Sequence, residues 1–243
     1  MSIYAALKRY LPELVVRRLA LTAILMGTST VSMANAPPNI TDAEMAMIPS
    51  YCPYTLHWGR GGVRDHPTPA GKYWVSVMGN TFWAMHHYCF AEIYMLRAMK
   101  HTAEYRKSLL NSARENYIYI RRNALKNAPP TFVLLPEVHT RIGVTELRMS
   151  LPRDAEKSFA QARAIKPDYW PAYSHWVEFL IDSGEMAEAK RLVETGLKYS
   201  PNSKVLREQQ RLLGEKASNS ARQHDGPESS DTDKEATTPP ASK

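Results

Sequence analysis

The sequence has little cysteine and no long apolar run. Its 243 residues include only two cysteines, Cys52 and Cys89, which excludes a disulfide-rich scaffold and a four-cysteine zinc site. No stretch reaches about 18 uninterrupted apolar residues, which excludes a multi-span membrane protein. Hydrophobic residues nevertheless make up 44% of the chain, enough for a folded core. The length and composition therefore indicate a globular protein of one or two domains.

Motifs for catalysis and metal binding are also missing. The sequence contains no H-E-x-x-H zinc motif, no C-x-x-C-H haem motif and no G-K-[ST] phosphate loop. Adjacent histidines on a helix, such as His86 and His87, point about 100° apart and need help from elsewhere to ligate one ion. His57 and His66 could give that help, but hydrogen-bonded histidines are favoured over a metal site. We therefore expect a protein that is not an enzyme and holds no metal and no cofactor.

The N-terminus has the three parts of a secretory signal. Four basic residues precede a short apolar run, Leu19–Met26, and small residues then end in the A-x-A pattern Ala34-Asn35-Ala36. The apolar run is short for a bilayer core about 30 Å thick, which favours cleavage near Ala36 over retention as an anchor. We therefore predict that residues 1–36 are a signal peptide and that the mature protein is periplasmic, with no stable membrane span after cleavage.

The C-terminal residues 215–243 lack every large apolar side chain. They contain no Phe, Trp, Tyr, Leu, Ile, Val or Met, and their acidic residues outnumber their basic ones. Such a segment cannot bury enough apolar surface to offset the entropy lost on ordering. The composition predicts a disordered polar tail.

A repeat of 34 residues precedes this tail. Pro167 and Pro201 are 34 positions apart, and residues of similar size stand at the same offsets before each proline: Ala155, Phe159 and Ala162 in one unit, and Ala189, Val193 and Gly196 in the other. Small residues let two helices approach closely, and the proline ends the second helix. In the second unit, apolar residues with helical spacing predict a first helix over 170–183.

The repeat resembles the tetratricopeptide repeat (TPR), whose signature is W-x2-L-G-x2-Y, then A-x3-F, then P. The resemblance covers about 136–213 and implies an all-α fold, a short TPR-like α-solenoid of antiparallel helix pairs. Residues 136–214 would form two repeats plus a capping helix that begins at Lys204. Two repeats are few for a stable solenoid, and the amphipathic stretches 80–99 and 102–126 are expected to complete it as a divergent long hairpin within 80–135.

Residues 37–79 form an irregular segment rich in glycine, proline and aromatic residues. One interpretation is a loop that covers the end of the solenoid. The other is a surface for a glycan or small ligand, with Trp58, Tyr73 and Trp74 as platforms. In an oxidising compartment Cys52 and Cys89 are expected to form a disulfide, whereas two separate buried thiols are the alternative.

The resemblance to TPR proteins also implies a binding groove on the first helices of the pairs. Helical spacing places nine residues there: Glu137, Thr140, Arg141, Val144, Arg148, Ser174, His175, Glu178 and Asp182. Their mixed charges suit a peptide or helix of another protein. We expect an adaptor that helps to assemble an envelope complex, such as a pilus, a secretion machine or a polysaccharide exporter.

The net charge of +7 is concentrated in part on residues 97–126 of the long hairpin. In an exported protein this basic stretch is expected to face an acidic partner surface, an anionic lipid headgroup or an acidic polymer, and no nucleic acid is expected as a partner.

Overall fold

The computed structural model describes residues 35–127 and 132–224. The predicted signal peptide, apart from Asn35 and Ala36, lies outside the described residues, as does the part of the predicted tail after His224. Among the residues described, no helix combines the length and apolarity needed to cross a membrane.

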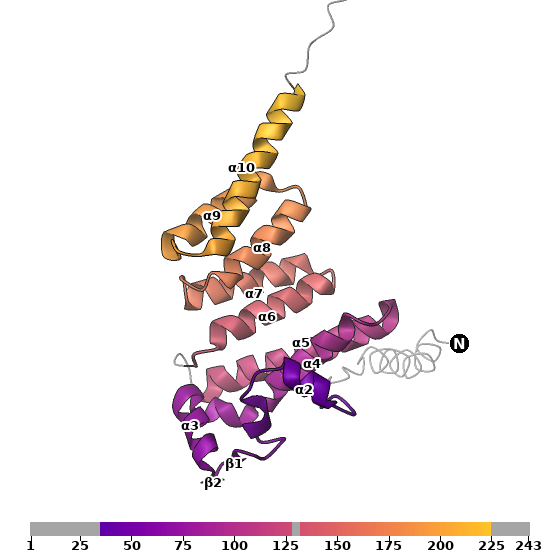
Figure 1. Cartoon of the computed structure of the whole chain (residues 1–243), viewed down its shortest axis with the longest axis vertical. Helices are drawn as coiled ribbons and strands as arrows, with labels where there is room; N and C mark the ends of the chain where they lie inside the picture. Colours follow the sequence, from indigo (N-terminus) through magenta and orange to yellow (C-terminus); the bar gives the residue numbers. More distant parts are fainter. Residues whose placement is uncertain (1–34, 128–131, 225–243) are drawn as a thin grey trace, which may run out of the picture. The chain divides into compact units, whose positions relative to one another are not determined.

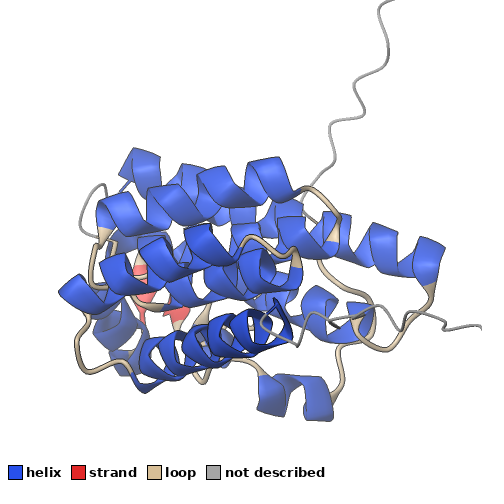
Figure 2. Cartoon of the chain, turned by 90° about the horizontal axis from the view of Figure 1, so that it is seen from above, coloured by secondary structure: helices blue, strands red, loops and turns tan. Residues whose placement is uncertain are grey.

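Helices make up most of the described chain (Figures 1 and 2). Seven of them follow one another from the middle of the chain onward: α4 (His86–Ala98), α5 (Ala103–Asn127), α6 (Leu135–Arg148), α7 (Pro152–Ile165), α8 (Pro171–Asp182), α9 (Met186–Tyr199) and α10 (Lys204–His224). Neighbours pack as the pairs α4–α5, α6–α7 and α8–α9, and each pair also contacts the next one. The chain is thus an all-α, TPR-like solenoid of antiparallel helix pairs.

The two repeats have equivalent turns and equivalent cores. Ser150, after α6, and Gly184, after α8, are 34 residues apart and both have positive φ, at 60° and 81°. The small residue Gly143 of α6 lies against the ring of Phe159 in α7, as a Cβ atom added there would be 2.9 Å from that ring. Phe159 and its counterpart Val193 are fully buried, as the repeat pattern predicts.

The segment before the long hairpin is more regular than its sequence suggests. It contains five short elements besides one longer helix: α2 (Asp42–Met47), η1 (Cys52–Tyr54), β1 (Gly62–Val63), β2 (His66–Pro67), α3 (Pro69–Met78) and η2 (Gly79–Ala84). The prediction of an irregular segment over 37–79 is therefore wrong for α3. This helix begins where Thr68 accepts a hydrogen bond from the Gly71 amide and Pro69 takes the first turn.

Two predicted helix boundaries also differ. The helix expected from Asn80 is a 3-10 helix up to Ala84, because Gly79 has a φ of 65° that ends α3, and the α-helix starts only at His86. At the other end, α10 continues to His224, so the prediction of a disordered tail from 215 onward is wrong for residues 215–224. Extending an existing helix costs far less free energy than starting one, which allows polar residues to continue α10.

Candidate functional site

A groove lies between α6 and α8, the first helices of the two repeats. It encloses a hollow of about 390 Å³. Its lining consists of Val144, Leu147 and Arg148 from α6 and His175, Glu178, Phe179 and Asp182 from α8. The structure therefore brings five of the nine predicted groove residues together: Val144, Arg148, His175, Glu178 and Asp182. We call these seven lining residues the α6–α8 groove.

Leu147 and Phe179 of the α6–α8 groove were not predicted from the sequence. Leu147 stands three residues after Val144, and Phe179 stands four residues after His175, so helical spacing could have indicated both. The ring of Phe179 stacks on Trp176 with centroids 4.8 Å apart, which fixes its position. These two side chains add apolar surface between the charged ones.

The charges of the groove are arranged asymmetrically. Glu178 and Asp182 are exposed on the α8 side, while Arg148 is exposed on the α6 side and forms no ion pair with any described residue. Burial lowers the pKa of His175, so this ring is neutral near pH 7 and accepts or donates hydrogen bonds as an uncharged group. The groove can thus contact apolar, acidic and basic groups of one ligand.

Four predicted groove residues do not line this hollow. Thr140 and Ser174 are buried, at 3% and 7% exposure, and the Thr140 hydroxyl donates to the Pro136 carbonyl. Glu137 and Arg141 belong instead to a polar cluster between α4, α5 and α6. Helical spacing placed these four on the correct helices but could not show which side chains the neighbouring helices cover.

The polar cluster combines two carboxylates, two tyrosines and one arginine. Tyr88 donates to Glu137 and Tyr117 donates to Glu92, each at 2.6 Å. Arg141 lies between both carboxylates, with its Nε 3.4 Å from Glu92 Oε1 and 3.6 Å from Glu137 Oε1. Burial raises the pKa values of Tyr88 and Tyr117, so both hydroxyls keep the protons that they donate. The two hydrogen bonds and the two ion pairs of this cluster link α4, α5 and α6.

Some aromatic residues of the N-terminal segment pack against the core, and others are exposed to solvent. Trp58 and Trp74 are half-buried and pack against the core, and Trp74 contacts Tyr51 edge-on at 5.6 Å. Tyr73 is 59% exposed. Tyr73 and Trp74 are in edge-on contact, with ring centroids 5.0 Å apart, whereas the rings in contact with Trp58 are those of His57 and Phe90.

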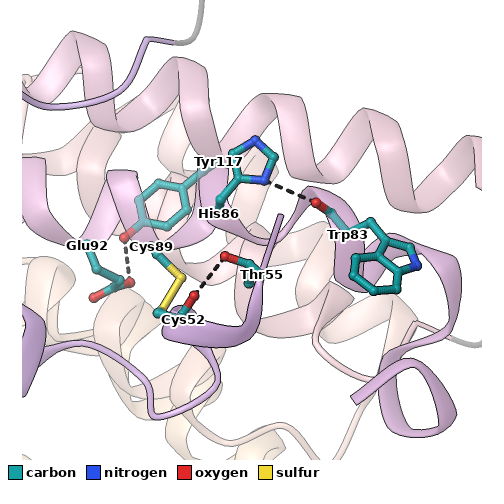
Figure 3. The surroundings of a disulfide bond; sticks show 7 residues. All are labelled: Cys52, Thr55, Trp83, His86, Cys89, Glu92 and Tyr117. Carbon is teal, nitrogen blue, oxygen red and sulfur yellow. Dashed lines mark hydrogen bonds between the residues drawn. A yellow bond between two sulfur atoms is a disulfide. The ribbon is translucent and has the colours of Figure 1, made fainter. Parts of the chain in front are cut away.

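Residues around the disulfide explain how this segment is attached (Figure 3). Cys52 and Cys89 form the predicted disulfide, which joins η1 to α4, and both cysteines are fully buried. The Thr55 hydroxyl donates to the Cys52 carbonyl at 2.8 Å. The disulfide thus fixes η1 on α4, and the Thr55 hydrogen bond stabilises the turn at the end of η1.

The histidines near the disulfide make hydrogen bonds of their own. His86 Nδ1 lies 3.1 Å from the Trp83 carbonyl (Figure 3). His87 Nδ1 lies 2.7 Å from Asn116 Oδ1. Burial lowers the pKa of His86 to about 4. No group of three or more His, Cys, Asp or Glu within residues 35–127 and 132–224 is placed to hold a metal ion.

The basic stretch 97–126 is partly neutralised. Arg97 is paired with Glu44 at 2.6 Å, and Arg114 is paired with Glu146 at 2.7 Å. Arg121, Arg122 and Lys126 form no ion pair with a described residue. Lys100, Arg106 and Lys107, at and just after the turn between α4 and α5, also form no ion pair with a described residue, so unpaired positive charge lies near both ends of α5.

Comparisons with known proteins give a limited similarity. No family model matches the sequence, and no curated protein matches it. Among solved structures, the chain is similar to the crystal structure of the Sgt2 TPR domain from Aspergillus fumigatus, with a TM-score of 0.43 and 19% sequence identity. The similarity covers 60% of this chain and 90% of that chain. The helix pairs of the chain itself establish the TPR-like solenoid.

Proposed function

We propose that the protein is an adaptor that binds a segment of another protein in the α6–α8 groove. The observation that supports this most directly is the composition of the groove: apolar Val144, Leu147 and Phe179 lie between an unpaired arginine and two exposed acids. Apolar pockets with a few polar groups around them are typical of sites that bind peptides or small ligands. A peptide with one large apolar side chain and charges on both sides would use every part of this surface.

The predicted export of the protein favours a partner in the cell envelope. A disulfide that is fully buried in the core fits an oxidising compartment, because such bonds form and persist there. We therefore place the adaptor in the periplasm, in the assembly of an envelope complex such as a pilus, a secretion machine or a polysaccharide exporter.

The test uses the chain from residue 37 onward as bait for envelope extracts of the source organism. Arg148→Glu and Glu178→Lys change exposed charges of the α6–α8 groove and should leave the fold intact. Lys198→Glu changes an equally exposed charge on α9 and is the control. We expect a partner that the wild type and the control retain and the groove variants lose. A partner bound equally by all four proteins would contradict the groove, and a bait that enriches no protein would contradict the adaptor.

A further inference from the structure

Residues of α5 and α6 lie opposite one another at two places along the helices that are seven residues apart, and we call these places the first and second levels. At the first level, Arg114 donates two hydrogen bonds to Glu146 Oε1, at 2.9 and 2.7 Å. The hydroxyl of Ser158, on α7, donates to Glu146 Oε2 at 2.7 Å. The Glu146 side chain is only 2% exposed, so a buried carboxylate neutralises the arginine at this level.

The second level repeats the arginine but not the acid. Arg121 stands seven residues after Arg114, and His139 stands seven residues before Glu146. Seven residues are about two helical turns, and because the two helices run in opposite directions this places Arg121 opposite His139. Burial is the main cause that lowers the pKa of His139 to about 4, and the positive charge of Arg121 is the second cause. A neutral histidine therefore stands where the first level has a carboxylate.

Both Arg121 and His139, the residues of the second level, have polar atoms without hydrogen-bond partners among the described residues. Arg121 is half-buried, yet it forms no hydrogen bond or ion pair with any described residue. His139 is only 5% exposed, and its Nδ1 has no hydrogen-bond partner. Buried polar atoms normally have partners, and a partly buried charge normally has a counter-ion. Among residues 35–127 and 132–224, none supplies a negatively charged acceptor to Arg121 and His139.

The surroundings of Arg121 are also poor in negative charge. Arg122 follows Arg121, and the chain contains no Asp or Glu between Glu115 and Glu137. Of the acids nearest to Arg121, Glu146 is bonded to Arg114 and Glu115 lies 3.8 Å from the same guanidinium. The N-terminus of α6, at Leu135, adds the positive end of a helix dipole four residues before His139.

We propose that Arg121 and His139 form a binding site for a single oxyanion, a carboxylate, phosphate or sulfate group, at the junction of α5 and α6. The guanidinium can donate two parallel hydrogen bonds to such a group, and the imidazole can add a third from a ring N–H. The oxyanion can be free in solution or belong to an acidic side chain of a partner. The site is separate from the α6–α8 groove, so the result of its test is independent of the proposed adaptor function.

The experiment measures the thermal unfolding midpoint of the chain from residue 37 in 1–20 mM sodium phosphate, with sodium chloride at equal ionic strength as the reference. Phosphate stabilises folded proteins in general, so the comparison between variants is decisive. We expect phosphate to raise the midpoint of the wild type by about 2–4 °C, as for a bound ligand in a domain of this size. Arg121→Gln should lose this rise, and Arg122→Gln, which removes the neighbouring exposed charge, should keep it.

Two further arms complete the test. Sodium acetate that stabilises as well as phosphate would identify a carboxylate site, whereas an effect of phosphate alone would identify a tetrahedral anion. In the wild type, the NMR signals of the His139 ring should shift saturably with the active anion, while those of the exposed His101 should stay unchanged. This second measurement decides the question if Arg121→Gln does not fold. Equal stabilisation of the wild type and Arg121→Gln, or unshifted His139 signals, would overturn the proposal.

Discussion

Arg97 of α4 donates two hydrogen bonds to Glu44 of α2, at 2.6 and 2.9 Å, although the two residues are 53 positions apart. The hydrogen bond from Arg97 is the main cause that lowers the pKa of Glu44 from 4.5 to about 2. A carboxylate whose pKa is lower in the folded state stabilises the fold above its unfolded pKa, and this contribution disappears as the pH falls through the folded pKa.

The first prediction concerns this ion pair and pH. Above about pH 5, Glu44→Gln should lower the free energy of unfolding by about 1–2 kcal/mol, because it removes charge-assisted hydrogen bonds. The difference from the wild type should shrink between pH 4.5 and pH 2. Urea unfolding over this pH range measures it. Glu194→Gln, at an exposed position of α9, is the control, and a difference for Glu44→Gln that does not change with pH would contradict the assignment.

The second prediction concerns the buried carboxylate between α5, α6 and α7. Glu146→Ala should lower the free energy of unfolding by about 3 kcal/mol or more, because Arg114 and Ser158 lose their partner in a buried place. Asp154→Ala breaks an exposed pair with Lys157 and should change it by less than about 1 kcal/mol. Urea unfolding at pH 7 gives both values, and equal losses would show that Glu146 has no special role.

The third prediction uses two glycines in different surroundings. An added Cβ at Gly143 would approach the buried ring of Phe159 to 2.9 Å, so Gly143→Ala should cost about 1–3 kcal/mol despite the better helix propensity of alanine. At Gly214 in α10 no atom lies within 4 Å of an added Cβ, and Gly214→Ala should raise stability by up to about 1 kcal/mol. Thermal unfolding of both variants measures the contrast. Stabilisation by Gly143→Ala would refute the close contact between α6 and α7.

The fourth prediction concerns the disulfide. The bond closes a loop of 37 residues, so the double variant Cys52→Ala/Cys89→Ala should lose about 3–4 kcal/mol of stability in the chain-entropy model. Chemical denaturation with and without a reducing agent measures the loss. The reducing agent should have little effect on the double variant, and a wild type whose stability is unchanged on full reduction would contradict the expectation.

Local patterns were sufficient to predict the repeats. The equal spacing of Pro167 and Pro201, with small residues at matching positions, identified α6 to α9 because each feature acts within one helix pair. The disulfide was also predictable, as Cys52 and Cys89 are the only cysteines.

Features that depend on distant contacts were not predictable. Glu146 stands in the repeat pattern where an aromatic residue is usual, and only the structure shows that Arg114, 32 positions earlier, makes its burial possible. The helix α3 is different, because its start at Thr68-Pro69 and the helical spacing of its core-facing residues Gly71, Trp74, Val75 and Met78 are local signals from which it could have been predicted. In the groove, the sequence identified both helices and five lining residues, but not which neighbours are covered by adjacent side chains.

The attachment of the N-terminal segment also determines how the protein responds to a pulling force. Arg97 holds Glu44 and donates to the carbonyls of Pro38 and Asn39, and Asn116 of α5 donates to the carbonyl of Asn35, so tension on the start of the described chain acts first on hydrogen bonds to α4 and α5. Once these break, extension can proceed only as far as Cys52, where the covalent bond to Cys89 transfers the load directly into α4. The N-terminal segment is thus a short tether whose extension stops at Cys52, and further load is borne by α4 and the helices packed on it.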